Sequence, residues 1–456
     1  MSEQTQGLLM SEQTQLKRNI RLFEGIIFVI GFVIGSGIFI KPAVVLQNTG
    51  SPGGALAIWI VGGVISICAA LSIAEIAAYI PKLGGLYTYL SEIYGNVVGF
   101  LYGWGEAIIA SPGGSGAMAI AVATFATFFI PMNGMQQKAL AIGLIAFIIS
   151  INAIATKLGV WAQTISAVLK MIPIAAIVIF GLVNGTAHDI NFVNIGGVKG
   201  GGIGIALLGV LWAYDGWINT CTLGAEMEKP EKNLPKSIII GVLFVIVVYA
   251  LFNMAIFNVL PAAQVVASDK VGVDVSAKLF GNGATAFITA GMMFSVFGAL
   301  NAQMVCGTRI ALAMGQKREL PAGKILGAIH PKLRTPINAL IFEGLITTIF
   351  ILGGSFNSLS DLTIFVIWIF FTIGISGVFV LRKRIPRDPK LYHIPLYPII
   401  PILGLIGGCY LMYATVTETF SSAMLGIGLT LIGLPVYYYY KKKQGLDKPQ
   451  TSSSSR

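Results

Sequence analysis

Long apolar runs separated by short polar segments recur along the whole chain of 456 residues. Each run holds about 20 residues, which as a helix spans a hydrocarbon core roughly 30 Å thick. We expect twelve such segments, at residues 22–46, 54–80, 96–130, 138–156, 160–184, 200–222, 236–260, 280–315, 337–353, 361–383, 396–415 and 419–441. Because no stretch remains for a soluble domain, the pattern predicts an all-α integral membrane protein with twelve transmembrane helices.

The composition and the placement of charge agree with this prediction. The chain is 55% hydrophobic and only 11% charged, whereas a soluble protein is about 25% charged. The net charge is +11, but the Lys and Arg residues gather in alternate loops, after segments 6, 8, 10 and 12. This is the positive-inside pattern, which places both termini in the cytoplasm of a cell that has the protein in its plasma or inner membrane. The basic residues therefore indicate topology and a lipid bilayer as partner, not nucleic acid.

Two of the apolar segments contain glycine-rich interruptions in their middle. The first is Gly35-Ser36-Gly37-Ile38-Phe39, and the second runs from Trp212 to Trp217 through Asp215 and Gly216. An unwound helix at membrane depth is tolerated where it lines a cavity, and transporters use such breaks to hold a polar ligand near mid-membrane. The alternative is two packing kinks in a channel or a structural membrane protein. Paired breaks favour the transporter.

The breaks lie in segments 1 and 6, which predicts a repeat of five helices. An odd number of helices per unit requires the second unit to have inverted orientation. The third segment of the first unit carries Ser111-Pro112-Gly113-Gly114, and its counterpart, segment 8, is interrupted more mildly around Gly298. We expect the first repeat at 19–190, the second at 191–394, and two further helices within 395–443.

Two polar tails flank the predicted membrane domain. Residues 1–18 are expected to be a cytoplasmic tail; the Met1–Gln6 sequence recurs at Met10–Gln15, a possible duplicated start, and no apolar core of a secretory signal is present. The serine-rich stretch 444–456 is expected to be a disordered cytoplasmic tail.

The two breaks together have the charge layout of a free amino acid. A helix that restarts near Ile38 exposes amide groups at Gly35-Ser36-Gly37, and the helix dipole adds positive potential there, which suits a carboxylate. The preceding half-helix ends in unpaired carbonyls around Val33 and Ile34, and the second break adds more, which suits an ammonium. The sequence therefore predicts a zwitterion site.

Several motifs in this order resemble the amino acid–polyamine–organocation superfamily. They are Gly35-Ser36-Gly37-Ile38-Phe39, residues 74–89 (AEIAAYIPKLGGLYTY), Trp212–Trp217, Glu226 followed by Asn233-Leu234-Pro235-Lys236, and Pro395-Leu396-Tyr397-Pro398. Within the superfamily the chain is similar to the L-amino acid transporter group, as a bacterial relative of the light subunits of heteromeric amino acid transporters. The resemblance runs from about Arg18 to Lys443. It implies a five-plus-five inverted repeat of the LeuT type with two extra helices, and sodium-independent amino acid exchange.

The resemblance also implies roles for individual residues. The amides of Gly35, Ser36 and Gly37 would hold the substrate carboxylate. The carbonyls of Val33, Trp212 and Asp215 would hold its amino group, with Ala213 in the same site, and the Trp212 side chain would form the gate. The animal light subunits carry a cysteine in the loop after segment 3, for a disulfide to a heavy subunit. The corresponding loop here, residues 131–138, has no cysteine, so no covalent heavy subunit is expected.

Lys170 lies in the middle of segment 5, ten residues after Val160. A charge in hydrocarbon costs at least ~2.5 kcal/mol, so such residues are usually functional and face the protein interior. The resemblance places this lysine where sodium-coupled relatives hold a sodium ion. Its ammonium is expected to bridge carbonyls of residues 33–35 and polar groups of segment 8 such as Ser295. The alternative is that the segment bounds are wrong and the side chain reaches an interface.

Asp215 has two interpretations. As a short acidic residue just before a restarting helix, its side chain is expected to cap that helix while its carbonyl serves as a ligand. The alternative is that its carboxylate pairs with the substrate amine.

The resemblance implies a sodium-independent antiporter that works by alternating access. The residues, including the bulky Trp212, favour small neutral L-amino acids such as Ala, Ser, Cys and Thr as its substrates. No acidic residue beyond Asp215 and no spare Arg is evident for a charged substrate side chain. The alternative is a proton-coupled amino acid symporter that uses Lys170. A sensor has no support, because no signalling domain is present. An enzyme is not expected, because no nucleophile–base or metal constellation is evident and His188, His330 and His393 all fall in loops. The four cysteines have no metal-site spacing, so neither a metal nor a cofactor is expected.

Overall fold

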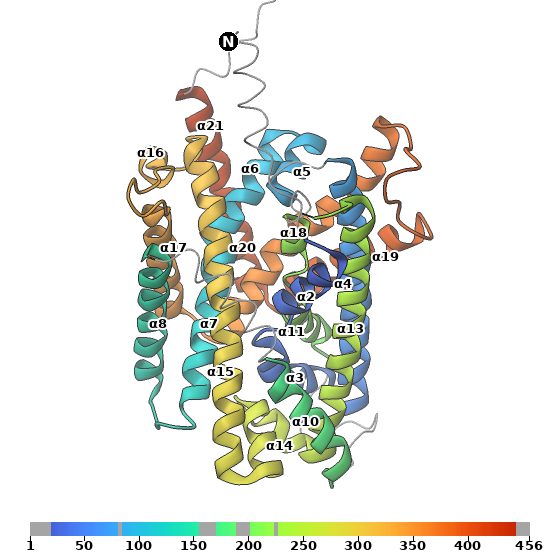
Figure 1. Cartoon of the computed structure of the whole chain (residues 1–456), viewed down its shortest axis with the longest axis vertical. Coiled ribbons are helices and arrows are strands. Elements are labelled where there is room, and N and C mark those ends of the chain that lie inside the picture. Colours follow the sequence, from blue (N-terminus) through green and yellow to red (C-terminus); the bar gives the residue numbers. More distant parts are fainter. Residues whose placement is uncertain (1–19, 81–83, 155–169, 188–200, 223–226, 444–456) are drawn as a thin grey trace, which may run out of the picture.

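Helices are the only regular secondary structure in the part of the chain that the structure describes. The computed structural model describes residues 20–80, 84–154, 170–187, 201–222 and 227–443. Within these residues no β-strand occurs, and the single strand-like pairing joins Ile20 to Met227. The predicted tails 1–18 and 444–456, the first part of predicted segment 5, and Glu226 lie outside the described residues. Figure 1 shows long helices running roughly along the vertical axis, with short helices at both ends.

Eight helical runs in the described part are long and apolar enough to cross a bilayer. Five are single helices: α4 (Pro52–Tyr79), α8 (Gly134–Ile154), α13 (Pro230–Val259), α18 (Phe356–Arg384) and α19 (Ile399–Glu418). One lies within α15 (Val271–Gln316), and two are composite, α6 (Asn96–Gly105) with α7 (Ser111–Ala126) and α20 (Phe420–Leu431) with α21 (Gly433–Lys443). The bent pair α2 (Leu22–Val33) and α3 (Gly37–Thr49) makes a ninth span if it is counted as one.

The remaining helices are shorter. Three are apolar and of 12 to 17 residues: α10 (Met171–Asn184), α11 (Ile203–Tyr214) and α17 (Ile337–Gly353). Four are connectors or short segments: α5 (Gly85–Tyr94), α12 (Ile218–Thr222), α14 (Ala262–Val266) and α16 (Gly323–Leu326).

The first predicted break is present between α2 and α3, whose axes differ by 52°. Ile34 leaves the helical region (φ −75°, ψ 103°), and the chain returns to it at Ser36. The last carbonyls of α2 and the first amides of α3 therefore lack partners within their own helices.

The second break follows α11, because Asp215 is extended (φ −67°, ψ 160°). Gly216 then adopts φ +109°, a conformation that favours glycine. A Cβ at Gly216 would also lie 2.7 Å from the carbonyl oxygen of Phe32, so the second break lies directly against the first. At the other end of α11, the amides of Gly204 and Ile205 donate to the carboxylate of Glu418, at 3.1 and 2.9 Å. A carboxylate at a helix N-terminus stabilises it, so α19 anchors α11.

The broken helices lie in the middle of the bundle (Figure 1). Helix α3 packs against α11, and α13 packs against α2, α4 and α10. On the other side α15 packs against α7 and α10, while α18 contacts α4, α7, α11 and α19. Full helices thus enclose both breaks, which keeps their irregular backbone away from lipid.

Two irregularities differ from the sequence expectation. The span Asn96–Ala126 is not broken at Ser111, but contains a π-helical turn, Glu106–Ala110, immediately before it. Helix α15 departs from helical geometry at Gly281 (φ 68°) and stays helical around Gly298. Glycine permits an irregular backbone without requiring it, and close helix packing is its other common use in membrane helices.

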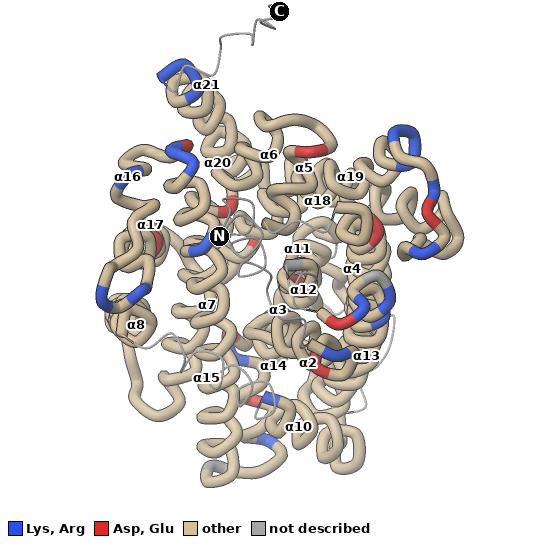
Figure 2. Tube along the Cα trace, turned by 45° about the horizontal axis from the view of Figure 1, so that its top comes forward, with Lys and Arg blue, Asp and Glu red and all other residues tan. Residues whose placement is uncertain are grey.

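Basic residues gather at one end of the bundle, as Figure 2 shows around α16, α21 and the segment after α18. They include Lys441–Lys443 in the last turn of α21 and Arg382–Arg384 in the last turn of α18. The opposite end carries α14 and the loop that joins α7 to α8 (Figure 1).

Candidate functional site

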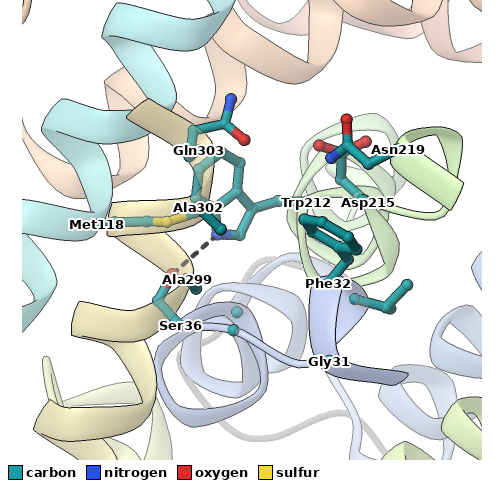
Figure 3. A pocket seen from close by; sticks show the side chains of 14 residues that line it. Gly31, Phe32, Ser36, Met118, Trp212, Asp215, Asn219, Ala299, Ala302 and Gln303 are labelled. Atoms are coloured by element: carbon teal, nitrogen blue, oxygen red, sulfur yellow. Dashed lines mark hydrogen bonds between the residues drawn. The ribbon is translucent and has the colours of Figure 1, made fainter. Parts of the chain in front are cut away.

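A small cavity lies where the two breaks meet (Figure 3). Six of the predicted site residues line it, namely Val33, Gly35, Ser36, Gly37, Trp212 and Asp215, whereas Ala213 is not among its lining residues. Its volume is about 30 Å³, which is the space of about one water molecule and too little for an amino acid. The broken helices or the side chains over them must therefore move to admit an organic ligand.

The two glycines of the first break have different surroundings. A Cβ at Gly37 would lie 2.6 Å from both Cα and Cβ of Ala213, so the start of α3 touches the end of α11 at a point where no side chain fits. A Cβ at Gly35 would have Ala299 at 3.8 Å as its nearest contact. Gly37 is therefore required for packing between the breaks, whereas Gly35 lines the cavity and has room for a small side chain.

The indole of Trp212 covers the first break. Its Nε1 donates a hydrogen bond to Ser36 Oγ at 3.3 Å, shown as a dashed line in Figure 3. The ring also packs edge-on against Phe356 of α18, with 6.1 Å between ring centroids. Trp212 is therefore held against the first break by Ser36 on one side and Phe356 on the other.

Tyr249 of α13 connects the two breaks. Its fully buried hydroxyl lies 2.8 Å from the carbonyl oxygen of Ala213 and 3.2 Å from that of Val33. The Val33 carbonyl, predicted as a ligand, is thus already a hydrogen-bond acceptor. Sequence reasoning did not single out Tyr249, although a hydroxyl within an apolar segment was the signal available.

Lys170 is buried, with 2% of its side chain exposed, at the start of α10. Its ammonium donates to the carbonyl oxygens of Gly31 at 2.6 Å and Ile34 at 2.7 Å. These are end carbonyls of α2, where the helix dipole attracts a cation. The structure therefore brings Lys170 against the first break, and the alternative of a side chain reaching an interface does not apply.

The side-chain contacts of Ser295 and Asp215 differ from those expected from the sequence. The Ser295 hydroxyl on α15 is buried and has no hydrogen-bond partner in the described part of the chain, so no bond to Lys170 is present. Asp215 Oδ1 is likewise buried and unpartnered among the described residues, and the residue lines the cavity. The Asp215 carboxylate also interacts with the backbone N–H of Gly216, two residues before α12. The side chain therefore has one unpartnered oxygen at the cavity and a backbone contact just before α12.

The cavity has further lining residues that the sequence did not single out. They come from α7, α15, the end of α2 and α12, and include Phe32, Met118, Asn219, Ala299, Ala302 and Gln303. In Figure 3, the amide groups of Gln303 and Asn219 lie on opposite sides of Trp212, and Met118 extends from α7 toward Ala302. A glutamine in the apolar run of α15 was the one signal available for this helix.

Other buried carboxylates have partners away from the cavity. Glu75 receives two hydrogen bonds from the Arg382 guanidinium, at 2.6 and 2.8 Å, and Glu343 accepts from Ser111 and Thr308 at 2.6 and 2.7 Å. Among the described residues, no group of three or more His, Cys, Asp or Glu is arranged to hold a metal ion.

Comparisons with known proteins agree with a solute carrier. Residues 20–438 match the amino acid permease family. The chain is 38% identical to the serine/threonine exchanger SteT of Bacillus subtilis over 95% of this chain and 99% of that protein. It is 32% identical to the human b(0,+)-type amino acid transporter 1, over 96% of this chain and 92% of the relative. It is also 32% identical to the human cystine/glutamate transporter, over 94% and 86%.

The family match and these relatives cover nearly the whole chain, and the relatives are transporters and not enzymes. The chain therefore belongs to the amino acid permease family of the amino acid–polyamine–organocation superfamily of multi-pass membrane transporters.

Proposed function

We propose that this protein exchanges small neutral L-amino acids across the cell membrane by alternating access, without sodium. The observation that carries the proposal is the cavity between two broken helices, whose first break is held by the ammonium of Lys170. A lysine that supplies the cation at this point removes the need for a sodium ion there. The name of the serine/threonine exchanger, a relative over nearly the full length, supports small polar substrates.

Twelve membrane spans are part of this proposal. Eight long helical runs, one bent pair and the three shorter apolar helices α10, α11 and α17 supply segments for them. We assign residues 19–190 and 191–394 to the two inverted repeats and 395–443 to the two extra helices. The support is the pair of breaks, five segments apart, that meet at one cavity.

The cytoplasmic side is assigned to the end of the bundle that carries α16 and α21, because basic residues gather there. Both termini then lie in the cytoplasm. The loop between α7 and α8 lies on the outer side and has no cysteine, so we propose that the protein works without a disulfide-linked partner subunit.

The substrate carboxylate is assigned to the amides of Gly35, Ser36 and Gly37. The amino group is assigned to the carbonyls of Val33, Trp212 and Asp215. Oδ1 of Asp215 has no partner among the described residues, and Asp215 lines the same cavity. Tyr249 must release the Val33 carbonyl, or share it, when substrate binds. The bulk of Trp212 over a cavity of about 30 Å³ favours small side chains.

A proton-coupled symporter is the alternative, and the observation behind it is again Lys170. Its buried ammonium has two carbonyl partners and no ion pair with an acidic residue in the described part of the chain. Loss of its proton would weaken the hold on α2 and couple proton release to movement of the first break.

Transport by purified protein in liposomes decides between them. Exchange predicts uptake of labelled L-serine only into liposomes loaded with unlabelled amino acid, at a rate independent of sodium. Concentrative uptake into liposomes without internal amino acid, driven by a pH gradient alone, would favour the symporter. No amino acid transport under either condition would refute both.

A further inference from the structure

A second and much larger cavity lies toward the end of the bundle opposite α16 and α21. Its volume is about 400 Å³, within the range of small-molecule sites. Its walls include Ile40 and Val44 on α3, Ile120 and Thr124 on α7, and Phe356 and Asn357 at the start of α18, with further residues from α8 and α14.

This cavity lies directly outside the proposed substrate site. Ile40 and Val44 follow Gly37 by three and seven residues, so they continue the same face of α3. On α7, Met118 lines the small cavity and Ile120 the large one. Trp212 lines the small cavity, Phe356 lines the large one, and their rings pack against each other. Two aromatic side chains therefore separate the cavities.

The partition is braced by a buried ion pair. Lys41 of α3 is fully buried, and its ammonium lies 2.8 Å from Asp361 Oδ1 and 3.1 Å from Asn357 Oδ1 on α18. The same ammonium lies 5.3 Å from the centroid of the Phe356 ring. Because Asn357 and Phe356 both line the large cavity, its floor is held in place by α3 and α18.

The rim of the large cavity carries both signs of charge. Lys270, at the start of α15, is half-buried and donates from its ammonium to Thr127 Oγ1 at 3.1 Å. Its neighbour Asp269 is exposed, lines the cavity and has no ion pair among the described residues. The ammonium suits the carboxylate of an amino acid, and the carboxylate suits its amino group. The apolar floor suits its side chain.

We propose that this outer cavity is a second binding site for the transported amino acids, occupied before they pass between the broken helices. Lys270 binds the substrate carboxylate and Asp269 binds its amino group. The inference rests on the proposed transport function, and it adds a staging site on the outer face.

Kinetics with defined sidedness test the site. In proteoliposomes of known orientation, Lys270→Gln and Asp269→Asn should each raise the external KM for L-serine by about three- to tenfold. The maximal rate and the internal KM should stay unchanged. Lys278→Gln is the matched control, since this lysine lies on the same helix, is exposed and does not line the cavity. An external KM equal to that of the control, or an equal rise on both faces, would overturn the proposal.

Occupancy is tested separately by thiol protection. Val44→Cys places a thiol in the cavity, in a chain whose exposed Cys409 is replaced by Ser. External L-serine should slow its reaction with an impermeant thiol reagent at least threefold, and should still do so with Lys170→Ala added, where exchange is expected to fall. No protection in the parent, or protection lost with Lys170→Ala, rules the outer site out. Absence of exchange by the wild-type protein would refute the transport proposal instead.

Discussion

The ammonium of Lys170 lies 2.7 Å from the carbonyl oxygen of Ile34, the residue at which the first helix unwinds. A second bond to Gly31 spans the last turn of the same half-helix. A cation at a helix C-terminus is stabilised by the free carbonyls and the dipole. Here the cation is the side chain of Lys170 at the start of α10, so its hydrogen bonds fix the position of the first break relative to α10.

Replacing Lys170 with alanine should therefore release the first break. Each charge-assisted bond contributes about 1.5–3 kcal/mol, so exchange should fall at least tenfold. Size-exclusion chromatography should still show a folded, inserted protein, because the bonds order the site and not the bundle. Lys278→Ala is the control for loss of a lysine. Exchange at the wild-type rate in Lys170→Ala would refute this role.

Substitution by alanine should have different effects on exchange at the two glycines of the first break, Gly35 and Gly37. Gly37→Ala drives a methyl group to within 2.6 Å of the Ala213 backbone, so it should separate the breaks and reduce exchange strongly. Gly35→Ala has open space to 3.8 Å and should leave the protein folded. Thermal stability and L-serine exchange are measured together for both. Equal tolerance of both substitutions would contradict the close contact between Gly37 and Ala213.

A larger side chain at Gly35 tests the carboxylate site itself. Gly35→Leu should abolish substrate binding, because the side chain would block approach to the amides of the first break. Thermal stability with and without saturating L-serine is the readout, since a ligand that binds the folded state stabilises it. A retained shift in Gly35→Leu would count against binding at these amides.

Removing the Tyr249 hydroxyl should change transport more than folding. Tyr249→Phe deletes the group that lies 2.8 Å from the Ala213 carbonyl and 3.2 Å from that of Val33. A neutral hydrogen bond contributes about 0.5–1.5 kcal/mol, which predicts a change of about two- to tenfold in KM or in the exchange rate. Tyr214→Phe is a control, because the Tyr214 hydroxyl has no partner in the described part of the chain. Identical kinetics for the two variants would exclude a bridging role for Tyr249.

Removing one partner of the Lys41–Asp361 ion pair should destabilise the protein more than removing both partners. Lys41→Met leaves the Asp361 carboxylate in a largely buried position without its cation, a change that costs about 3–5 kcal/mol. The double variant Lys41→Met with Asp361→Leu should recover a large part of that loss, since no unpaired charge remains. Thermal unfolding in detergent measures both. A double variant as unstable as the sum of the two singles would show that the pair is not coupled.

Much of the fold and part of the site were predictable because their causes are local in the chain. Glycines at 35, 37 and 216 mark where a helix unwinds, and both breaks are present. Lys170 was predictable because an isolated charge in an apolar run has few stable positions. By contrast, the Gly298 interruption was not found, because a glycine in a helix can equally serve close packing.

The length of the apolar runs and the spacing of their glycines are sufficient to specify a membrane protein with two broken helices, since a bilayer leaves few ways to satisfy the backbone. Which groups meet at the breaks is a different matter. Tyr249 lies 36 residues from Ala213 and 216 from Val33, and Phe356 reaches Trp212 from another helix. Such contacts depend on the rotation and register of packed helices, which are set by the summed fit of many side chains. Only the tertiary structure therefore places Tyr249 between the breaks and the large cavity beyond Trp212.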